Sequence, residues 1–278
     1  MARIRVSGDL RMPKKGSERR PFGIVAAIRR GIRQAALRRG IFIGRVTAPG
    51  APETPEANLA FMFASLFINC VIDVGAHTGE FASHIRELGY RGRIVSFEPV
   101  SEHFDRLATR MSGDRHWRGF RMALGAEDRE AEIHVTRSST YTSFLAPSRF
   151  GKDLFDDDLR SVREERVQIR RLDGIWDQCV AGIEKPVVFL KMDTQGLDLE
   201  VLRGTGNRLE SVSAIQTEVS LKPIYSGMTT GLADSLAQLK ELGFEPTSFA
   251  PVSRDPVDHL RLIEMDCILI RAASEVSA

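Results

Sequence analysis

The 278-residue sequence has few cysteines and no long hydrophobic run. Its three cysteines, Cys70, Cys179 and Cys267, are too few and too widely spaced for a disulfide framework or a zinc knuckle. Cys70 and Cys267 stand in apolar runs, which predicts buried free thiols and a reducing compartment. No stretch reaches the ~18 uninterrupted apolar residues of a membrane span, and the polar first residues do not resemble a secretory signal. We therefore expect a cytoplasmic protein.

Charge is nearly balanced over the whole chain, at +2, but it is unevenly distributed. Residues 1–50 contain 13 Lys or Arg and 2 Asp or Glu, so the rest of the chain is net acidic. An acidic body with a basic arm differs from the uniformly basic composition of many nucleic-acid binders, and we expect no nucleic-acid partner. Hydrophobic residues make up 42% and charged residues 27% of the chain, which excludes wholesale disorder.

The basic arm carries a helical pattern. Ile24, Ile28 and Ile32 recur every four residues, with arginines mostly on the other side, as in an amphipathic helix. Such a helix either makes a peripheral contact with the inner membrane surface or packs on the domain itself. Residues 48–57 hold three prolines and a glycine and predict a linker. We expect residues 1–57 to form a basic N-terminal helical extension.

From residue 58 onward, apolar strand patterns alternate with helical patterns. This alternation predicts an α/β fold with a mostly parallel, doubly wound sheet. The last two strands are joined without a helical pattern, which predicts an antiparallel hairpin at one sheet edge. The predicted domain spans 58–272, with 137–165 as an inserted loop or lid and 273–278 as a tail. We predict strands at 70–74, 93–98, 118–124, 131–136, 167–171, 186–193, 213–219, 243–250 and 262–270.

Helices are predicted between these strands. The first is short and apolar and spans 58–67. The next two have inner faces at 81–88 and 104–111, the second with Ser101 as its N-cap. A further helix is predicted near 197–204, and the last has an inner face at 232–239 and ends at Gly243.

The sharpest motif is the run Val71-Ile-Asp-Val-Gly-Ala-His-Thr-Gly79. It predicts a buried strand that leads through a glycine-bearing turn into a helix. Gly75 lets the backbone turn and approach a ligand, and Gly79 permits close packing where the helix begins. Asp73 ends the strand, where its carboxylate would accept hydrogen bonds. Glu98 ends the next strand about 20 residues later, at the position where an acid binds ribose hydroxyls.

These features predict a nucleoside cofactor. Nicotinamide enzymes favour three glycines in G-x-G-x-x-G, whereas this turn supplies Gly75 and Gly79 and no phosphate-holding lysine. That spacing suits S-adenosylmethionine, which has no pyrophosphate but has a charged amino-acid end and a sulfonium. An NAD-dependent dehydrogenase remains the alternative from another class of enzyme, and the missing third glycine disfavours it.

The chain resembles the FkbM family of S-adenosylmethionine-dependent methyltransferases over roughly residues 60–270. The resemblance implies a class I methyltransferase (Rossmann-like) fold and S-adenosylmethionine as cofactor. It implies an O-methyltransferase that acts on a hydroxyl of a sugar, glycolipid or polyketide-like acceptor. The order and spacing of five stretches carry it: VIDVGAHTGEFASHIRELGYRGRIVSFEPVSEHFDRL (71–107), RMALGAEDREAEIHV (121–135), VQIRRLDGI (167–175), VVFLKMDTQGLDLEVLRG (187–204) and SAIQTEVS (213–220).

The resemblance carries over to individual residues. Asp73, Gly75 and Glu98 match the family's cofactor positions. Ala123 and Leu124 match the place where the adenine edge usually lies.

Asp193 matches the acid that ends the fourth strand of the family. The chain departs from the family at His77, where Asn is common. It also reads Asp193-Thr-Gln195-Gly-Leu-Asp198 where the family commonly reads D-x-E-G-x-E. Gln195 thus replaces an acid, and Asp198 is a shortened one.

Methyl transfer to a hydroxyl requires an aligned acceptor oxygen and a group that takes its proton. Asp193, Glu218 and His77, in that order, are the predicted catalytic residues, since Asp193 and Glu218 end neighbouring predicted strands. Asp193 could instead bind the cofactor or cap the following helix. A Mg²⁺ shared by Asp193 and Glu218 is a side possibility, but no third ligand is evident, and we expect no metal. A protein that binds S-adenosylmethionine without catalysis is the remaining alternative.

Overall fold

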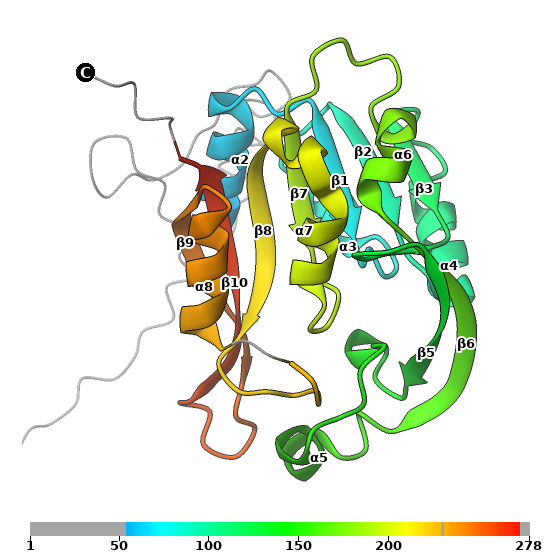
Figure 1. The fold of residues 1–278 in the computed structure, drawn as a ribbon, viewed down its shortest axis with the longest axis vertical. Helices are drawn as coiled ribbons and strands as arrows, with labels where there is room; N and C mark the ends of the chain where they lie inside the picture. The colour runs from blue at the N-terminus through cyan, green and yellow to red at the C-terminus, as the bar shows by residue number, and fades with distance from the viewer. Residues whose placement is uncertain (1–53, 229–230, 273–278) are drawn as a thin grey trace, which may run out of the picture.

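The structure, a computed structural model, describes residues 54–228 and 231–272. The predicted basic helix and most of the predicted linker lie outside these residues. The main sheet contains β1 (Cys70–Val74), β2 (Arg93–Phe97), β3 (Trp117–Phe120), β7 (Val188–Met192), β8 (Val212–Ser220), β9 (Phe244–Arg254) and β10 (Leu262–Arg271). Their spatial order is β3-β2-β1-β7-β8-β10-β9 (Figure 1).

Five neighbouring strands, from β3 to β8, run parallel. β10 runs antiparallel to both β8 and β9, so the last two strands form a hairpin at the sheet edge. The sheet order reverses direction at β1, from which the chain winds first toward β3 and later toward β8. The predicted fold class, a doubly wound parallel sheet with an antiparallel edge hairpin, is confirmed.

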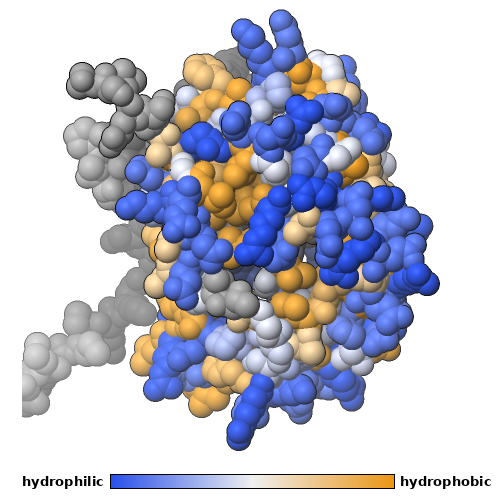
Figure 2. Space-filling model, in the orientation of Figure 1, coloured by the Kyte–Doolittle hydropathy of each residue, from blue (hydrophilic) through white to orange (hydrophobic). Residues whose placement is uncertain are grey.

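Helices cover both faces of the sheet (Figure 1). Buried residues of α2 (Pro55–Ser65), α3 (Glu80–Glu87) and α4 (Ser101–Met111) pack on one face. Those of α6 (Leu172–Cys179), α7 (Asp198–Thr205) and α8 (Leu232–Glu241) pack on the other. The face of the molecule shown in Figure 2 is mostly hydrophilic, with apolar patches between the polar groups. Within the described ranges, no helix is both long and apolar enough to cross a membrane.

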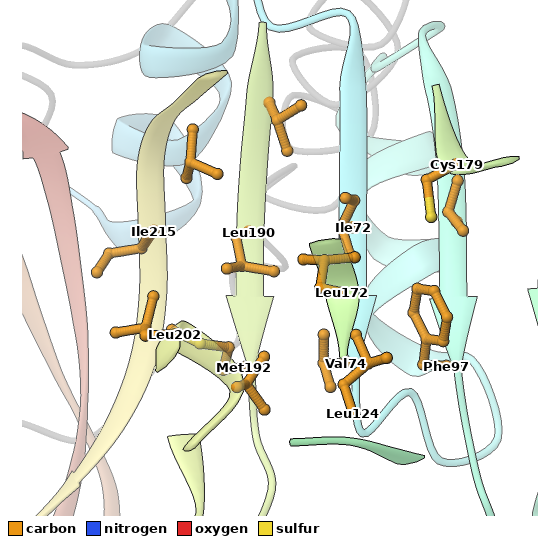
Figure 3. Packing of buried hydrophobic residues seen from close by; sticks show 14 of the residues in the cluster. Ile72, Val74, Phe97, Leu124, Leu172, Cys179, Leu190, Met192, Leu202 and Ile215 are labelled. Atoms are coloured by element: carbon orange, nitrogen blue, oxygen red, sulfur yellow. The ribbon is translucent and has the colours of Figure 1, made fainter. Parts of the chain in front are cut away.

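The core follows from the two-residue period of the central strands. Ile72 and Val74 of β1 lie with Leu190 of β7 in the cluster beneath α6 and α7 (Figure 3), whereas Val71 packs toward the opposite helices. All five residues of β1 and all five of β7 are buried. Continuous burial is the pattern of parallel strands covered on both faces. It makes Asp73 and Lys191 the two exceptions in otherwise apolar strands.

A second, three-stranded sheet was not predicted. It consists of β4 (Ala123–Leu124), β6 (Ser161–Arg170) and β5 (Arg129–Thr136), in that order. The single strand predicted at 118–124 is therefore two strands, β3 and β4, which belong to different sheets. The strand predicted at 167–171 begins six residues earlier, at Ser161. Its first half is mostly exposed and pairs with β5, so it lacks the apolar alternation that marks a strand in sequence.

The segment predicted as an inserted loop or lid, 137–165, contains defined elements. These are the short 3₁₀ helix η1 (Ser139–Tyr141), the helix α5 (Arg149–Phe155) and the first residues of β6. A small apolar cluster under α5, formed by Leu159, Ile224, Tyr225 and Ile263, attaches this segment to the domain. A role as a lid stays a prediction.

The structure tests the predicted ends of two helices and adds a helix that was not predicted. Ser101 is the first residue of α4 rather than its N-cap, which is Val100. The reason is that carboxylates supply the caps: Glu98 accepts from the Val100 N–H, and Glu165 accepts from the Ser101 N–H, each at 2.9 Å. α6 was not predicted. Gly243, with φ of +83°, follows the last residues of α8 and ends this helix as predicted.

We expect opposite effects of the same substitution at two helical glycines. A β-carbon at Gly204 in α7 would overlap the carbonyl oxygen of Gly125, whereas one at Gly174 in α6 meets nothing within 4 Å. Gly204→Ala should therefore lower the free energy of unfolding by about 1–3 kcal/mol. The matched control, Gly174→Ala, should raise it by about 0.5–1 kcal/mol through the unfolded chain. Chemical denaturation measures both, and equal effects of the two variants would contradict the packing of α7 against the β4 turn.

Candidate active site

A cavity of about 560 Å³ opens at the carboxyl edge of the parallel strands. Its wall includes residues 74–77 after β1, 97–99 after β2, 193–195 after β7, and Glu218 near the end of β8. Residues 139–140 and 142–144, around η1, close another side. Open α/β sheets bind ligands at this edge, next to the point where the strand order reverses. The cavity is therefore the candidate site.

Most of the residues predicted from the sequence line this cavity. The predicted cofactor residues in its wall are Gly75, Glu98, Ala123 and Leu124, and the predicted catalytic residues in its wall are His77, Asp193 and Glu218. Two predicted cofactor residues, Asp73 and Gly79, are not in the wall. Asp73 is fully buried in β1, and a β-carbon on Gly79 would meet Leu107 of α4. These roles stay predictions, but the structure separates these two residues from the others.

The turn after β1 is fixed between its two neighbouring strands. The Gly75 N–H donates to Phe97 O at the end of β2 at 3.0 Å, and the Asp193 N–H donates to Val74 O at 3.1 Å. Gly75 has φ of +72°, and a β-carbon there would overlap the Asp193 carbonyl oxygen. The glycine is therefore required twice, once by the backbone conformation and once by this close approach.

Glu98 is a buried carboxylate that the turn itself orients. Its Oε2 accepts from the His77 N–H at 2.9 Å, and its Oε1 accepts from the Val100 N–H at 2.9 Å. Each carboxylate oxygen can accept a further hydrogen bond. The Glu98 carboxyl group is thus held rigidly in the cavity wall while it keeps acceptor capacity for ligand hydroxyls.

His77 lies on the Glu98 side of the cavity. Its φ of +47° is unusual for a residue with a side chain. Its Nε2 is 2.9 Å from Ser139 Oγ of η1, and its ring lies 4.5 Å from the ring of His103. These contacts connect the turn after β1 with the segment over the cavity. No hydrogen bond found among the described residues joins His77 to Asp193 or Glu218.

Gln195 joins the two predicted catalytic carboxylates. Its Nε2 donates to Asp193 Oδ1 at 3.0 Å and to Glu218 Oε2 at 3.1 Å. Its Oε1 accepts from the Tyr225 hydroxyl at 2.8 Å, and its φ is +53°. Residues with positive φ and a side chain often mark functional sites, where other contacts hold them in place. Asp198, three residues later, does not join Asp193 to Glu218. Its carboxylate accepts hydrogen bonds from Thr194, Thr217 and the Glu218 N–H, and so fixes the loop after β7 to β8.

Sequence reasoning missed several polar residues in the wall, among them Lys191, Gln216 and Asp266. Lys191 and Asp266 stand inside apolar strands, where only their polarity could have marked them. Gln216 Nε2 donates to Asp266 Oδ2 at 3.0 Å, a contact between the neighbouring strands β8 and β10. Asp73, in turn, faces Lys191, with 3.5 Å between Oδ1 and Nζ.

The part of the cavity around Asp193, Glu218 and Asp266 is its acid side. Burial and mutual repulsion raise the pKa values of Glu218 and Asp266 there. The pKa of Glu218 is well above its ordinary value because the group is buried and faces Asp193 and other acids. The pKa of Asp266 is raised to about 6 by burial and by Asp193, partly offset by Lys191. Asp266 therefore changes protonation near pH 6. Among the described residues, no group of three or more His, Cys, Asp or Glu is arranged to hold a metal ion.

We expect Asp266→Asn to stabilise the protein at high pH. A carboxyl group whose pKa is raised on folding, from 3.8 to about 6, favours the folded state below pH 3.8 and loses this contribution as pH rises to 6. Asparagine removes that penalty, so the free energy of unfolding should rise by roughly 2–3 kcal/mol at pH 8. The gain should shrink toward pH 4. Denaturation of both proteins at the two pH values measures it, and a gain independent of pH would contradict the raised pKa.

Comparisons with known proteins give three resemblances. A region of the AMB antimetabolite synthetase AmbE of Pseudomonas aeruginosa is 28% identical over 205 residues, which cover 63% of this chain and 9% of that protein. The chain thus spans less than a tenth of this relative. The solved methyltransferase FkbM of Methylobacillus flagellatus KT is 12% identical, with 88% of this chain and 60% of that chain covered and a TM-score of 0.43. Aeropyrum pernix fibrillarin is 14% identical, with 73% of this chain and 66% of that chain covered and a TM-score of 0.42.

The model of the methyltransferase FkbM domain matches residues 73–246, which is more than half of the chain. This match includes the turn after β1, Glu98, Asp193 and Glu218. It confirms the family identified from the sequence motifs and supports S-adenosylmethionine as the cofactor. The chain belongs to the FkbM methyltransferase family.

Proposed function

We propose that this chain transfers the methyl group of S-adenosylmethionine to a hydroxyl of a sugar, glycolipid or polyketide-like acceptor. One observation carries the proposal. Two carboxylates, Asp193 and Glu218, joined through Gln195, line the same cavity as the Gly75 turn and Glu98. The cavity therefore combines groups suited to a nucleoside cofactor with groups suited to taking a proton.

The wall fits the proposed cofactor. Glu98 keeps acceptor capacity for the ribose hydroxyls, and Ala123 and Leu124 offer an apolar surface for the adenine. S-adenosylmethionine supplies an activated methyl group on a positively charged sulfur.

In the proposed reaction, Asp193 takes the proton of the acceptor hydroxyl. A bond forms between the acceptor oxygen and the methyl carbon as the carbon–sulfur bond breaks, and the hydroxyl proton passes to the carboxylate. Gln195 holds Asp193 and Glu218 in one arrangement, because its amide donates to both. Glu218, with its raised pKa, is the next proton acceptor in line.

The lining supports a small hydroxylated acceptor over a nucleic acid. Lys191 is the single Lys or Arg that the cavity wall contains within the described residues, and it is already paired with carboxylates. Nucleic-acid sites need cations for phosphates. The wall also contains hydroxyl side chains, among them those of Ser139, Thr140, Thr142 and Ser143, and the amides of Gln195 and Gln216. These groups instead suit hydrogen bonds with acceptor hydroxyls.

Incubation with labelled S-adenosylmethionine and an extract of cell lipids and polysaccharides tests the proposal. Mass spectrometry should identify a hydroxylated molecule that gains one methyl group. Binding of S-adenosylmethionine without transfer to any fraction would favour the non-catalytic alternative. Thermal stabilisation by NAD in place of S-adenosylmethionine would favour a dehydrogenase.

We expect Glu98→Ala to weaken the binding of S-adenosylmethionine by roughly 10- to 100-fold, because the ribose hydroxyls lose a charged acceptor. Calorimetry on the folded variant measures the affinity. The matched control is Glu102→Ala on α4, whose carboxylate pairs with Arg106 and Arg163 outside the cavity. Unchanged affinity in a folded Glu98→Ala variant would remove the ribose assignment.

We expect Asp193→Asn to lower the rate of methyl transfer about 100-fold while S-adenosylmethionine binds nearly as before. Asparagine keeps an acceptor oxygen for Gln195 but cannot take a proton, and general-base assistance is typically worth about 10²–10⁴-fold. Single-turnover rates and calorimetry on the same protein separate the two effects. Parallel losses of rate and affinity would indicate that Asp193 binds the cofactor. Retention of the rate, with loss in Glu218→Gln or His77→Gln, would move the proton transfer to that residue.

A further inference from the structure

Lys191 is a buried lysine in the central strand of the sheet. It is 6% exposed and is the only charged residue of β7, whose other four residues are apolar. A lysine is rarely buried unless a partner compensates its charge, since removing an ammonium group from water is costly. The contacts of its Nζ therefore indicate why it stands there.

These contacts connect the two halves of the cavity. Nζ lies 3.3 Å from Asp193 Oδ2 and 3.4 Å from the Gly75 carbonyl oxygen, to which it donates. It lies 3.5 Å from Asp73 Oδ1 and 5.6 Å from the centre of the Phe81 ring. One ammonium group thus contacts the cofactor turn and the proposed base.

Lys191 is also the positive charge nearest to a group of acids. Burial lowers its pKa, but the facing carboxylates of Asp193, Asp73 and Asp266 raise it by more, so the side chain stays charged. In the acids around the cavity, its charge lowers the pKa of Asp266 and of Asp73. The titratable groups that face Asp193 from the packed elements are Lys191 in β7, Asp73 in β1, Glu218 in β8, Asp198 in α7, Tyr225 after β8, and Glu264 and Asp266 in β10.

We propose that Lys191 is a positioning residue that holds the Asp193 carboxylate beside the cofactor turn and supplies the positive charge that offsets the acids around it. This inference rests on the proposed function, in which Asp193 takes the acceptor proton. Lys191 would not touch the reacting atoms. It would act through Asp193, which its ammonium orients from one side while Gln195 orients it from the other.

A purely structural role is the competing explanation. In that case Lys191 would only neutralise Asp73, whose Oδ1 is buried and has no hydrogen-bond donor among the residues that the structure describes. Loss of the lysine would then lower stability and leave the pH dependence of the reaction unchanged. The two explanations therefore differ in the pH profile.

The experiment compares three variants with the unaltered chain. Lys191→Met removes the charge and keeps much of the side-chain volume. The double variant Asp73→Asn with Lys191→Met also removes the negative charge of the buried acid, which the single variant would leave without its cation. It should therefore fold even if the single variant does not. Lys185→Met is the matched control, because Lys185 is exposed and lies before β7, away from the carboxyl edge.

Two readouts are measured as a function of pH. We expect the acid limb of the transfer rate to move up by about one pH unit in both Lys191 variants, with the rate at pH 7 lowered roughly tenfold or more. S-adenosylmethionine affinity, measured by calorimetry, should change much less than the rate. The Lys185 control should leave both unchanged. An unmoved acid limb in a folded Lys191 variant, or an equal loss of affinity and rate, would overturn the proposal.

Carboxyl titration by ¹³C NMR separates this proposal from the proposed function. The Asp266 resonance should titrate clearly above pH 6 in Lys191→Met, since the lysine lowers its pKa. If the unaltered chain transfers no methyl group to any acceptor, the proposed function fails. An Asp266 titration that moves as expected would then still support the charge role of Lys191. An unmoved titration would overturn it regardless of activity.

Discussion

The close approach of Gly75 to the Asp193 carbonyl is the constraint on which the site depends. β1 and β7 are neighbours in the sheet, in register from Cys70–Val188 to Val74–Met192, so both end at the same level. The turn after β1 and the loop after β7 then meet without room for a β-carbon. This contact sets the distance between the cofactor side and the acid side of the cavity. Neither side can shift without moving a strand of the core, and this rigidity suits a reaction that needs aligned groups.

The same arrangement concentrates charge where the fold tolerates it least. Asp73 and Lys191 lie inside two strands that are otherwise wholly apolar, and Asp266 and Glu264 lie in a third. Burial of charged groups costs free energy that pairing offsets only in part. The raised pKa values of Glu218 and Asp266 are the measure of that cost. The extensive apolar packing on both faces of the sheet, one of which is drawn in Figure 3, stabilises the fold against this cost. The carboxylates are therefore retained at a cost in stability, as expected of groups kept for binding or catalysis.

The sequence predicted the elements whose signals are local. Continuous apolar runs marked β1 and β7, and the glycine turn with Glu98 marked the carboxyl edge. The second sheet was not predictable in this way, because the exposed half of β6 owes its conformation to pairing with β5. The interpretation of Asp73 illustrates a second limit. A carboxylate at a strand end could face a ligand or the next strand, and only the register with β7 shows that it faces Lys191. Lys191 and Asp266 were missed for the same reason, since their partners come from distant parts of the chain.

Two of the departures from the family pattern, at positions 195 and 198, can be explained together. At position 195 the chain has an amide in place of an acid, and this amide donates to Asp193 and Glu218, where a carboxylate would have added a third negative charge. At position 198 the shorter Asp reaches the Thr194 N–H and Thr217, and so caps the loop that carries Gln195. Lys191 then supplies the only positive side chain that the described wall contains. The acid side thus combines its carboxylates with one amide bridge and one buried cation, so its charge balance depends on Gln195 and Lys191 as much as on the acids themselves.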